Sequence, residues 1–177
     1  MLPRVRDMVV PTTSAGDASA RRDADGFEAF YRANVDRVYR ALAVTLRRDD
    51  LAHEAVDEAM ARAYARWPVV GELESPAGWV FRVGFNWATS WRRKLRRERP
   101  PVEDDAHPHH GPPDGAIVAR DALAMLPAPQ RAVLTCRILL DLSTAETAAA
   151  LGLTEGTVKS RLSRGLATLR SALSTEE

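Results

Sequence analysis

The side chains most suited to a chemical role form a polar face in the C-terminal part of the chain, within residues 154–170. On a helical wheel of about 100° per residue, these hydroxyl and cationic groups lie opposite or beside an apolar stripe that begins at Val158. Arginine and lysine can donate hydrogen bonds to guanine edges, and serine and threonine can reach bases or phosphates. The face therefore predicts binding to duplex DNA. Its members are Thr157, Lys159, Ser160, Arg161 and Arg164.

A second candidate nucleic-acid surface lies on an aromatic and basic segment in the middle of the chain. Asn86, Thr89 and Arg93 are spaced i, i+3 and i+7, which places them on one face of a helix. The carboxamide can read a base edge as donor and acceptor, and Arg93 can hold the adjoining backbone. The alternative is a solvated basic helix end that interacts favourably with the helix dipole.

Local signals around the first face predict a helix-turn-helix. Ser143, with Glu146 three residues later, has the capping-box pattern that starts a short helix, and Gly152 supplies a left-handed turn. Thr154 is the expected cap of the second helix. The alternative is a helical hairpin with solubilising charge. The short first helix, the turn glycine and a second helix with a net charge of +3 favour DNA binding.

Apolar residues at three- and four-residue spacing predict helices along the rest of the chain, and no alternating strand pattern occurs. We expect helices over residues 27–46, 51–67, 76–97, 117–126, 129–141, 144–151 and 155–173. Pro68 is expected to end the second helix, and Ser75-Pro76 to start the third. In the third helix we expect a buried stripe, so that two of its three tryptophans, Trp87 and Trp91, belong to the core. The stripe comprises Val80, Val83, Trp87, Trp91 and Leu95.

The predicted fold is all-α, with two small helical bundles joined by a proline-rich linker and a helix-turn-helix in the second bundle. The linker has no periodic apolar residues, which is typical of an interdomain connection. The expected divisions are a disordered N-terminal tail at residues 1–25, a first domain at 26–99, the linker at 100–116 and a second domain at 117–177.

Composition excludes several classes of protein. With 177 residues, 45% apolar and 28% charged, the chain can fold as one domain or two small ones. It has neither an apolar run long enough for a membrane helix nor a signal-peptide pattern, so we expect a cytoplasmic protein without membrane insertion. Cys136 is the single cysteine, so we expect a small core residue, no disulfide and no thiolate zinc site.

The sequence gives little support to an enzyme. His107, His109 and His110 form the densest imidazole cluster, but they lie among the prolines of the linker, where incidental composition outweighs a metal site. Neither a glycine-rich phosphate loop after a strand nor a nucleophile–base pair is recognisable. We therefore predict no catalytic residues, no metal and no cofactor. Two classes of binding protein stay open: a stand-alone helix-turn-helix regulator, and an adaptor that binds only protein.

The order of these parts resembles the extracytoplasmic-function (ECF) class of bacterial RNA polymerase sigma factors, over about residues 27–173. The first half is similar to sigma region 2, through LAHEAVDEAMARAYARW and SPAGWVFRVGFNWATSWRRKLRR. The second half is similar to region 4, where GTVKSRL is the most specific match. The resemblance implies a dissociable specificity subunit that binds core RNA polymerase and reads two promoter elements. An anti-sigma partner is common in this class.

The resemblance also assigns roles to residues. The acidic second helix would bind the clamp helices of the largest polymerase subunit, through Glu54, Asp57 and Glu58, and region 4 would bind the flap of the second-largest subunit. Region 2 would read the opened −10 element, with Asn86 on a flipped base. The −10 candidates are Asn86, Thr89, Arg92, Arg93 and Arg96. The polar face of region 4 would read the −35 element, and the linker would let both domains bind DNA at once.

Overall fold

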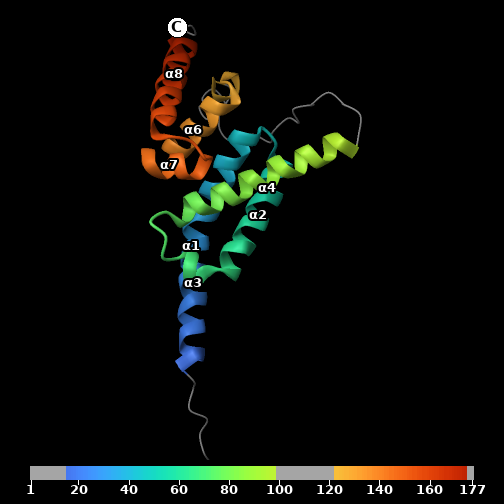
Figure 1. Cartoon of the computed structure of the whole chain (residues 1–177), viewed down its shortest axis with the longest axis vertical. Coiled ribbons are helices and arrows are strands. Elements are labelled where there is room, and N and C mark those ends of the chain that lie inside the picture. Colours follow the sequence, from blue (N-terminus) through green and yellow to red (C-terminus); the bar gives the residue numbers. More distant parts are fainter. Residues whose placement is uncertain (1–14, 99–121, 175–177) are drawn as a thin grey trace, which may run out of the picture.

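The computed structural model describes residues 15–98 and 122–174, with side chains described for residues 21–94 and 122–172. Within these ranges the protein is helical and has no strand, which confirms the all-α class (Figure 1). The helices are α1 (Ala15–Leu46), α2 (Asp49–Ala65), α3 (Trp67–Val70), α4 (Pro76–Glu98), α6 (Ala128–Ile138), α7 (Thr144–Leu151) and α8 (Glu155–Ser174). The linker with His107, His109 and His110 lies outside the described residues.

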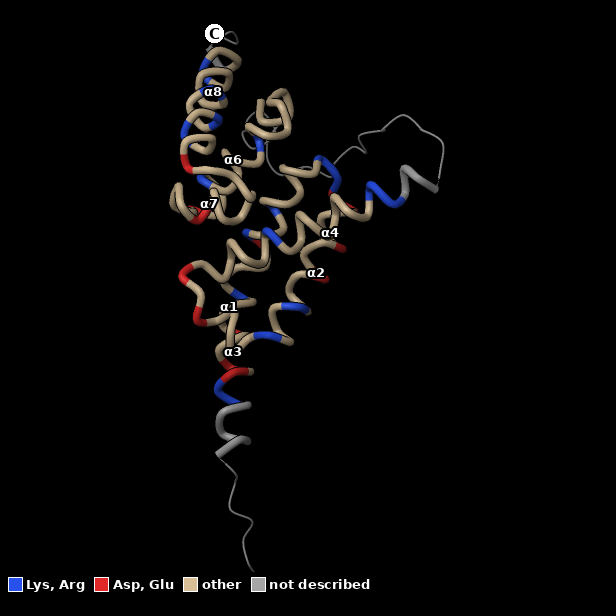
Figure 2. Tube along the Cα trace, viewed as in Figure 1, with Lys and Arg blue, Asp and Glu red and all other residues tan. Residues whose placement is uncertain are grey.

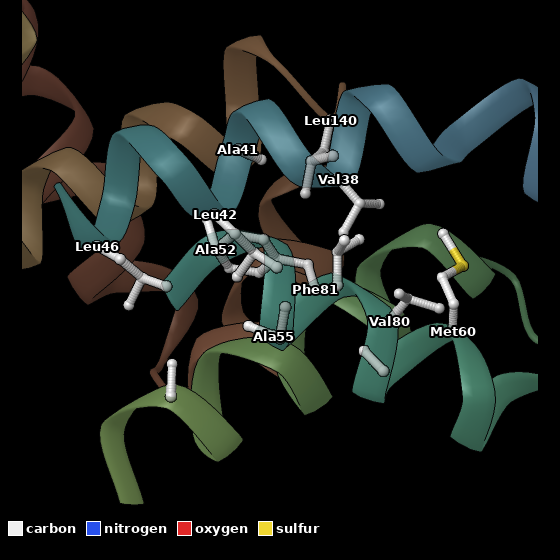
Figure 3. Packing of buried hydrophobic residues seen from close by; sticks show 14 of the residues in the cluster. Val38, Ala41, Leu42, Leu46, Ala52, Ala55, Met60, Val80, Phe81 and Leu140 are labelled. Carbon is white, nitrogen blue, oxygen red and sulfur yellow. The ribbon is translucent and has the colours of Figure 1, made fainter. Parts of the chain in front are cut away.

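The N-terminal half is built by α1, α2 and α4, which pack on one another through apolar faces (Figure 3). Val38, Leu42 and Leu46 recur every four residues on α1 and are buried, as the helical period requires. Phe81 of α4 is fully buried among them. Burying a side chain of this size contributes about 1.5–3 kcal/mol, so this cluster fixes how α4 lies across the other two helices.

Small residues decide how closely α4 approaches α2. A Cβ atom at Gly84 would lie 2.9 Å from the Ala55 carbonyl oxygen and 2.9 Å from Leu42 Cδ1. Ala88, one turn further along α4, is also fully buried. The buried face of α4 therefore runs through Phe81, Gly84 and Ala88, and the expected stripe through the tryptophans is wrong for Trp91, which is 41% exposed.

The N-terminal boundaries differ from the sequence predictions in two places. α1 begins at Ala15, so residues 15–25, expected in a disordered tail, are helical. This stretch is rich in alanine, the strongest helix former. α2 ends at Ala65, before Pro68, and Pro68 instead lies in the first turn of α3. Proline is tolerated there because the first amides of a helix have no intrahelical acceptor.

The C-terminal half is a helical unit in which α8 packs on α6 and α7. Val158 of α8 is fully buried against Val133 of α6 and Ala148 of α7. Gly165 of α8 lies directly against the side chain of Leu134, which is also fully buried. α6 ends at Ile138, three residues before the predicted end, and Asp141 takes a left-handed conformation with φ 53°.

The turn between α7 and α8 has the predicted local structure. Ser143 Oγ accepts a hydrogen bond from the Glu146 amide at 3.1 Å, and the Glu146 carboxylate accepts one from the Ser143 amide at 2.6 Å. Gly152 has φ 65°, a left-handed conformation that costs glycine little. Thr154 Oγ1 accepts from the Thr157 amide at 3.2 Å and caps α8. These contacts set the angle between the two helices.

Replacing Ser143 with alanine is expected to lower the free energy of unfolding by about 0.5–2 kcal/mol, because the Glu146 amide loses its acceptor. Thermal unfolding followed by circular dichroism measures the change. Ser163→Ala, an exposed serine on α8, is the matched control and should change stability by less than about 0.5 kcal/mol. Equal stability of the two variants would contradict the capping role.

The same cap makes stability depend on pH. Hydrogen bonds from Ser143 are the main cause that holds the pKa of the Glu146 carboxyl below its ordinary value. A depressed carboxyl pKa contributes stability above the unfolded-state pKa, and that contribution is lost as pH falls through the folded-state pKa. The stability difference between wild type and Ser143→Ala should therefore shrink in acid. A stability difference that stays constant through the acid range would argue against a contribution of the Glu146 carboxylate to the cap.

Candidate nucleic-acid interface

The polar face of α8 is held outward by the burial of its opposite side. Lys159 and Arg164 are exposed, and Thr157, Ser160 and Arg161 are half-buried. The hydroxyls of Thr154 and Thr157 lie 2.9 Å apart, and Ser160 Oγ donates to the Thr157 carbonyl oxygen at 3.0 Å. Cationic donors and hydroxyl oxygens are therefore presented together near the N-terminal half of α8. Figure 2 shows basic residues along α8.

The predicted face of α4 is divided between solvent and the other half of the protein. Asn86 and Arg93 are exposed, whereas Thr89 and Arg92 are half-buried. Thr89 Oγ1 donates to the Phe85 carbonyl oxygen at 2.9 Å, so its proton is held by the helix backbone. The Arg96 side chain lies outside the described residues. Asn86 keeps its carboxamide free to meet a base edge from solvent.

Two tryptophans lie on another side of α4, about 100–140° around the helix from Asn86. The rings of Trp87 and Trp91 are stacked, with centroids 5.9 Å apart and planes 8° from parallel. Trp91 is exposed, whereas Trp87 is half-buried and packs against the buried cluster of α1, α2 and α4. The exposed ring of Trp91 is a surface on which a single-stranded base can stack, on a different side of α4 from Asn86.

The acidic candidates lie on the solvent side of α2. Glu54 and Asp57 are exposed, and Glu58 is half-buried and accepts a hydrogen bond from Arg62 Nε at 2.7 Å. The other side of α2 is buried against α1 and α4. The carboxylates of Glu54 and Asp57 therefore face solvent, away from the buried side of α2. Glu58 is already hydrogen-bonded to a basic side chain of its own helix.

A cavity of about 330 Å³ lies where the two halves meet. Phe85, Thr89 and Arg92 of α4 line it from one side, and Arg131 and Arg161 from the other. No acidic residue is among its lining residues, although Arg131 is only 6% exposed. Burial, followed by repulsion from Arg47, lowers the pKa of the Arg131 guanidinium. Arg131 was not among the predicted site residues. The one sequence feature that marks it is its charge within the otherwise apolar face of α6.

The described residues hold no group of three or more His, Cys, Asp or Glu side chains that could bind a metal ion. Cys136 is buried in α6, as expected, and burial raises the pKa of its thiol to about 12. None of the described helices is long and apolar enough to cross a membrane.

Residues 117–169, which contain α7 and most of α8, match the family model for sigma-70, region 4. Over 154 residues the chain is 36% identical to the RNA polymerase sigma-E factor of Streptomyces coelicolor, covering 83% of this chain and 85% of the relative. It is 34% identical to the ECF RNA polymerase sigma factor SigL of Mycobacterium tuberculosis, covering 69% of this chain and 74% of the relative. The chain belongs to the ECF RNA polymerase sigma factors. The resemblance drawn from its sequence is confirmed.

Solved structures agree with this ECF sigma factor in fold. The sigma factor RpoE of Bartonella quintana, crystallised with the anti-sigma factor NepR, superposes with a TM-score of 0.69 at 23% identity, covering 85% of this chain and 98% of RpoE. CnrH, solved with the cytosolic domain of CnrY, superposes with a TM-score of 0.58 at 20% identity, covering 89% of this chain and 96% of CnrH. The helical architecture is therefore that of the family.

Proposed function

We propose that this sigma factor binds core RNA polymerase and directs it to promoters whose two elements are read by α4 and α8. The observation that carries the proposal is the geometry of α8. The helix is capped at Thr154, buried on its Val158 side, and presents Lys159 and Arg164 to solvent. A helix with cations near its N-terminal half suits the major groove of the −35 element.

The N-terminal half supplies the other two surfaces of the proposal. The exposed carboxylates of Glu54 and Asp57 on α2 would meet the clamp helices of the largest polymerase subunit, guided by complementary charge. Glu58 would also contact the clamp helices, after its carboxylate leaves Arg62 for a basic side chain of the polymerase. Region 4 would also contact the flap of the second-largest subunit. The chain itself would catalyse no reaction, and it would act in the cytoplasm, where its polymerase works.

On α4, exposed Asn86 would read an unpaired base of the −10 element, and Arg92, Arg93 and Arg96 would hold the strand backbone. Thr89 would add an acceptor oxygen, because its proton is already donated to the Phe85 carbonyl. RpoE was solved with the anti-sigma factor NepR, and CnrH with the cytosolic domain of CnrY. We extend this to the present chain and propose that an anti-sigma protein controls its access to polymerase.

Transcription of genomic fragments by core RNA polymerase, with and without this protein, tests the function. We expect new start sites preceded by a shared pair of spaced motifs. New starts without a shared pair of motifs would argue against two-element reading. Specific duplex binding by the protein alone, with no new start in the presence of polymerase, would instead support a stand-alone helix-turn-helix regulator.

Replacing Asn86 with alanine is expected to impair promoter opening by about tenfold, the scale of one lost base-edge contact, while binding to closed duplex changes little. Permanganate reactivity of unpaired thymines measures opening, and retention of the closed complex at low temperature measures duplex binding. Ser90→Ala, another exposed position on α4, is the control. Normal opening by Asn86→Ala would remove this residue from the −10 surface.

A further inference from the structure

Three arginines from three different helices line the cavity of about 330 Å³ between the two halves. Arg92 belongs to α4, Arg131 to α6 and Arg161 to α8. In this part of the protein α6 packs on α1, and α7 packs on α4 (Figure 1). The described residues that line the cavity include no aspartate or glutamate, so the cavity has a positive potential that favours an anion.

Arg131 is the most deeply buried of the three cations. Its Nε donates to the Thr45 carbonyl oxygen at 3.4 Å and its Nη1 to the Leu126 carbonyl oxygen at 3.0 Å, but its Nη2 has no acceptor among the described residues. Arg47 repels this guanidinium and contributes to its lowered pKa, so a fourth cation lies near the cavity. Buried charges are costly unless an opposite charge accompanies them. The structure of this cavity therefore calls for an anion.

The size of the cavity favours a small molecule. Its volume of about 330 Å³ lies in the range of small-molecule pockets, roughly 300–1,000 Å³. Because Arg131 is only 6% exposed, duplex DNA lying on the protein surface would not reach its guanidinium. The Arg161 side chain likewise has no hydrogen bond or ion pair with a described residue. Guanidinium groups bind phosphate oxygens through paired hydrogen bonds, so the expected anion carries phosphate.

The rest of the cavity lining is mostly apolar and includes one aromatic ring. Phe85 lines the cavity together with Leu46, Leu151 and Leu153. The ring of Phe85 is stacked on that of Phe81, with centroids 5.9 Å apart and planes 5° from parallel, which restricts its orientation. A nucleobase can stack on an aromatic ring of this kind. The lining therefore suits a ligand that joins phosphate to a planar ring.

Two threonine hydroxyls complete the lining of the cavity. Thr45 Oγ1 donates to the Ala41 carbonyl oxygen at 2.7 Å, and Thr89 Oγ1 donates to the Phe85 carbonyl oxygen at 2.9 Å. Since both protons are held by helix carbonyls, the hydroxyl oxygens are left as acceptors. They can accept hydrogen bonds from a sugar hydroxyl or from the amino group of a base.

We propose that this cavity binds a nucleoside polyphosphate, with its phosphates on Arg92, Arg131 and Arg161 and its base on Phe85. The inference goes beyond the proposed function, which counts Arg92 and Arg161 only as DNA contacts and gives Arg131 no role. If that function holds, nucleotide and promoter DNA share two cations, so the nucleotide concentration affects promoter binding. Nucleotide binding itself needs neither polymerase nor DNA, so its test is independent of the proposed function.

Isothermal titration calorimetry of the full chain with ATP and with GTP tests the ligand. Tripolyphosphate carries the phosphates without the base, and adenosine and guanosine carry the base without the phosphates. We expect one site per chain, and at least about tenfold tighter binding of the better nucleotide than of tripolyphosphate or its own nucleoside. Tripolyphosphate binding as tightly as the nucleotides would overturn the base site on Phe85. Absence of binding by both nucleotides would overturn the proposal.

Ala128 allows a test that leaves the buried residues unchanged. It lines the cavity, is exposed, and is the first residue of α6, where a glutamate interacts favourably with the helix dipole. We expect Ala128→Glu to weaken nucleotide binding at least about tenfold, because it adds a negative charge at the cavity. Ala128→Gln, which has the same size without the charge, should stay within about twofold of wild type. Equal affinities of these two variants would place the bound nucleotide elsewhere and overturn the proposal.

Arg131→Met tests the buried cation directly, since methionine keeps much of the side-chain length without the charge. We expect it to weaken nucleotide binding at least about tenfold, whereas Arg40→Ala, an exposed arginine of α1 that does not line the cavity, should not. Circular dichroism shows whether Arg131→Met is folded. Wild-type affinity of the folded variant would overturn the role of Arg131, and if the variant does not fold, the two Ala128 variants decide.

Discussion

Replacing Gly84 with valine is expected to push α4 away from α2 and to lower the free energy of unfolding by about 3 kcal/mol, the upper end for overpacking. The obstacle is the Ala55 carbonyl oxygen, 2.9 Å from the position of a Cβ atom, and a backbone group moves less easily than a side chain. A domain has only about 5–15 kcal/mol of stability, so a loss of about 3 kcal/mol is a large part of it and would raise the unfolded fraction more than about a hundredfold.

Urea unfolding followed by tryptophan fluorescence measures the effect of Gly84→Val, since Trp79, Trp87 and Trp91 lie on α4. Gly156→Ala is the control, because the nearest atom to its Cβ would be Thr154 Oγ1 at 4.0 Å. That substitution should be neutral or stabilise by about 0.5–1 kcal/mol, as expected for a helical glycine. Equal urea midpoints for wild type and Gly84→Val would contradict the close approach of α4 to α2.

Arg164→Ala is expected to reduce discrimination at one base pair of the −35 element by about 1–3 kcal/mol, which is about fivefold to over a hundredfold in affinity. The guanidinium is exposed on the polar face of α8 and can donate two hydrogen bonds to a guanine. Competition between single-base variants of the mapped promoter measures the effect.

Arg170→Ala serves as the matched control for Arg164→Ala. Arg170 is exposed on the same helix but lies about 120° around it, so it should leave base preference unchanged. If Arg164→Ala weakened binding equally on every sequence, with a smaller salt dependence, the residue would be a phosphate contact.

Features set by short stretches of sequence were predictable. The capping box at Ser143, the left-handed Gly152 and the bounds of α7 follow from neighbouring residues alone, and all three are confirmed. The buried face of α4 was predictable at Val80, which is fully buried, but not at Trp91. Gly84 and Ala88 also lie on this face, because their small size permits close packing against other helices, and the spacing of large apolar residues does not reveal them.

The candidate site likewise has features that were predictable from the sequence and features that were not. The exposure of Asn86, Lys159 and Arg164 follows from helical periodicity, because each lies away from the buried side of its own helix. The position of Arg161 beside Arg92 depends on how the two halves dock, and periodicity carries no information about that. Arg131 was missed for the same reason, since its acceptor Thr45 lies 86 residues away along the chain.

Gly84 has a consequence for genetics. Every other amino acid carries a Cβ atom, and at this position that atom would lie 2.9 Å from the Ala55 carbonyl oxygen and 2.9 Å from Leu42 Cδ1. A screen for loss of transcription should therefore recover many different amino acids at codon 84, whereas the exposed codon 90 on the same helix should tolerate most of them.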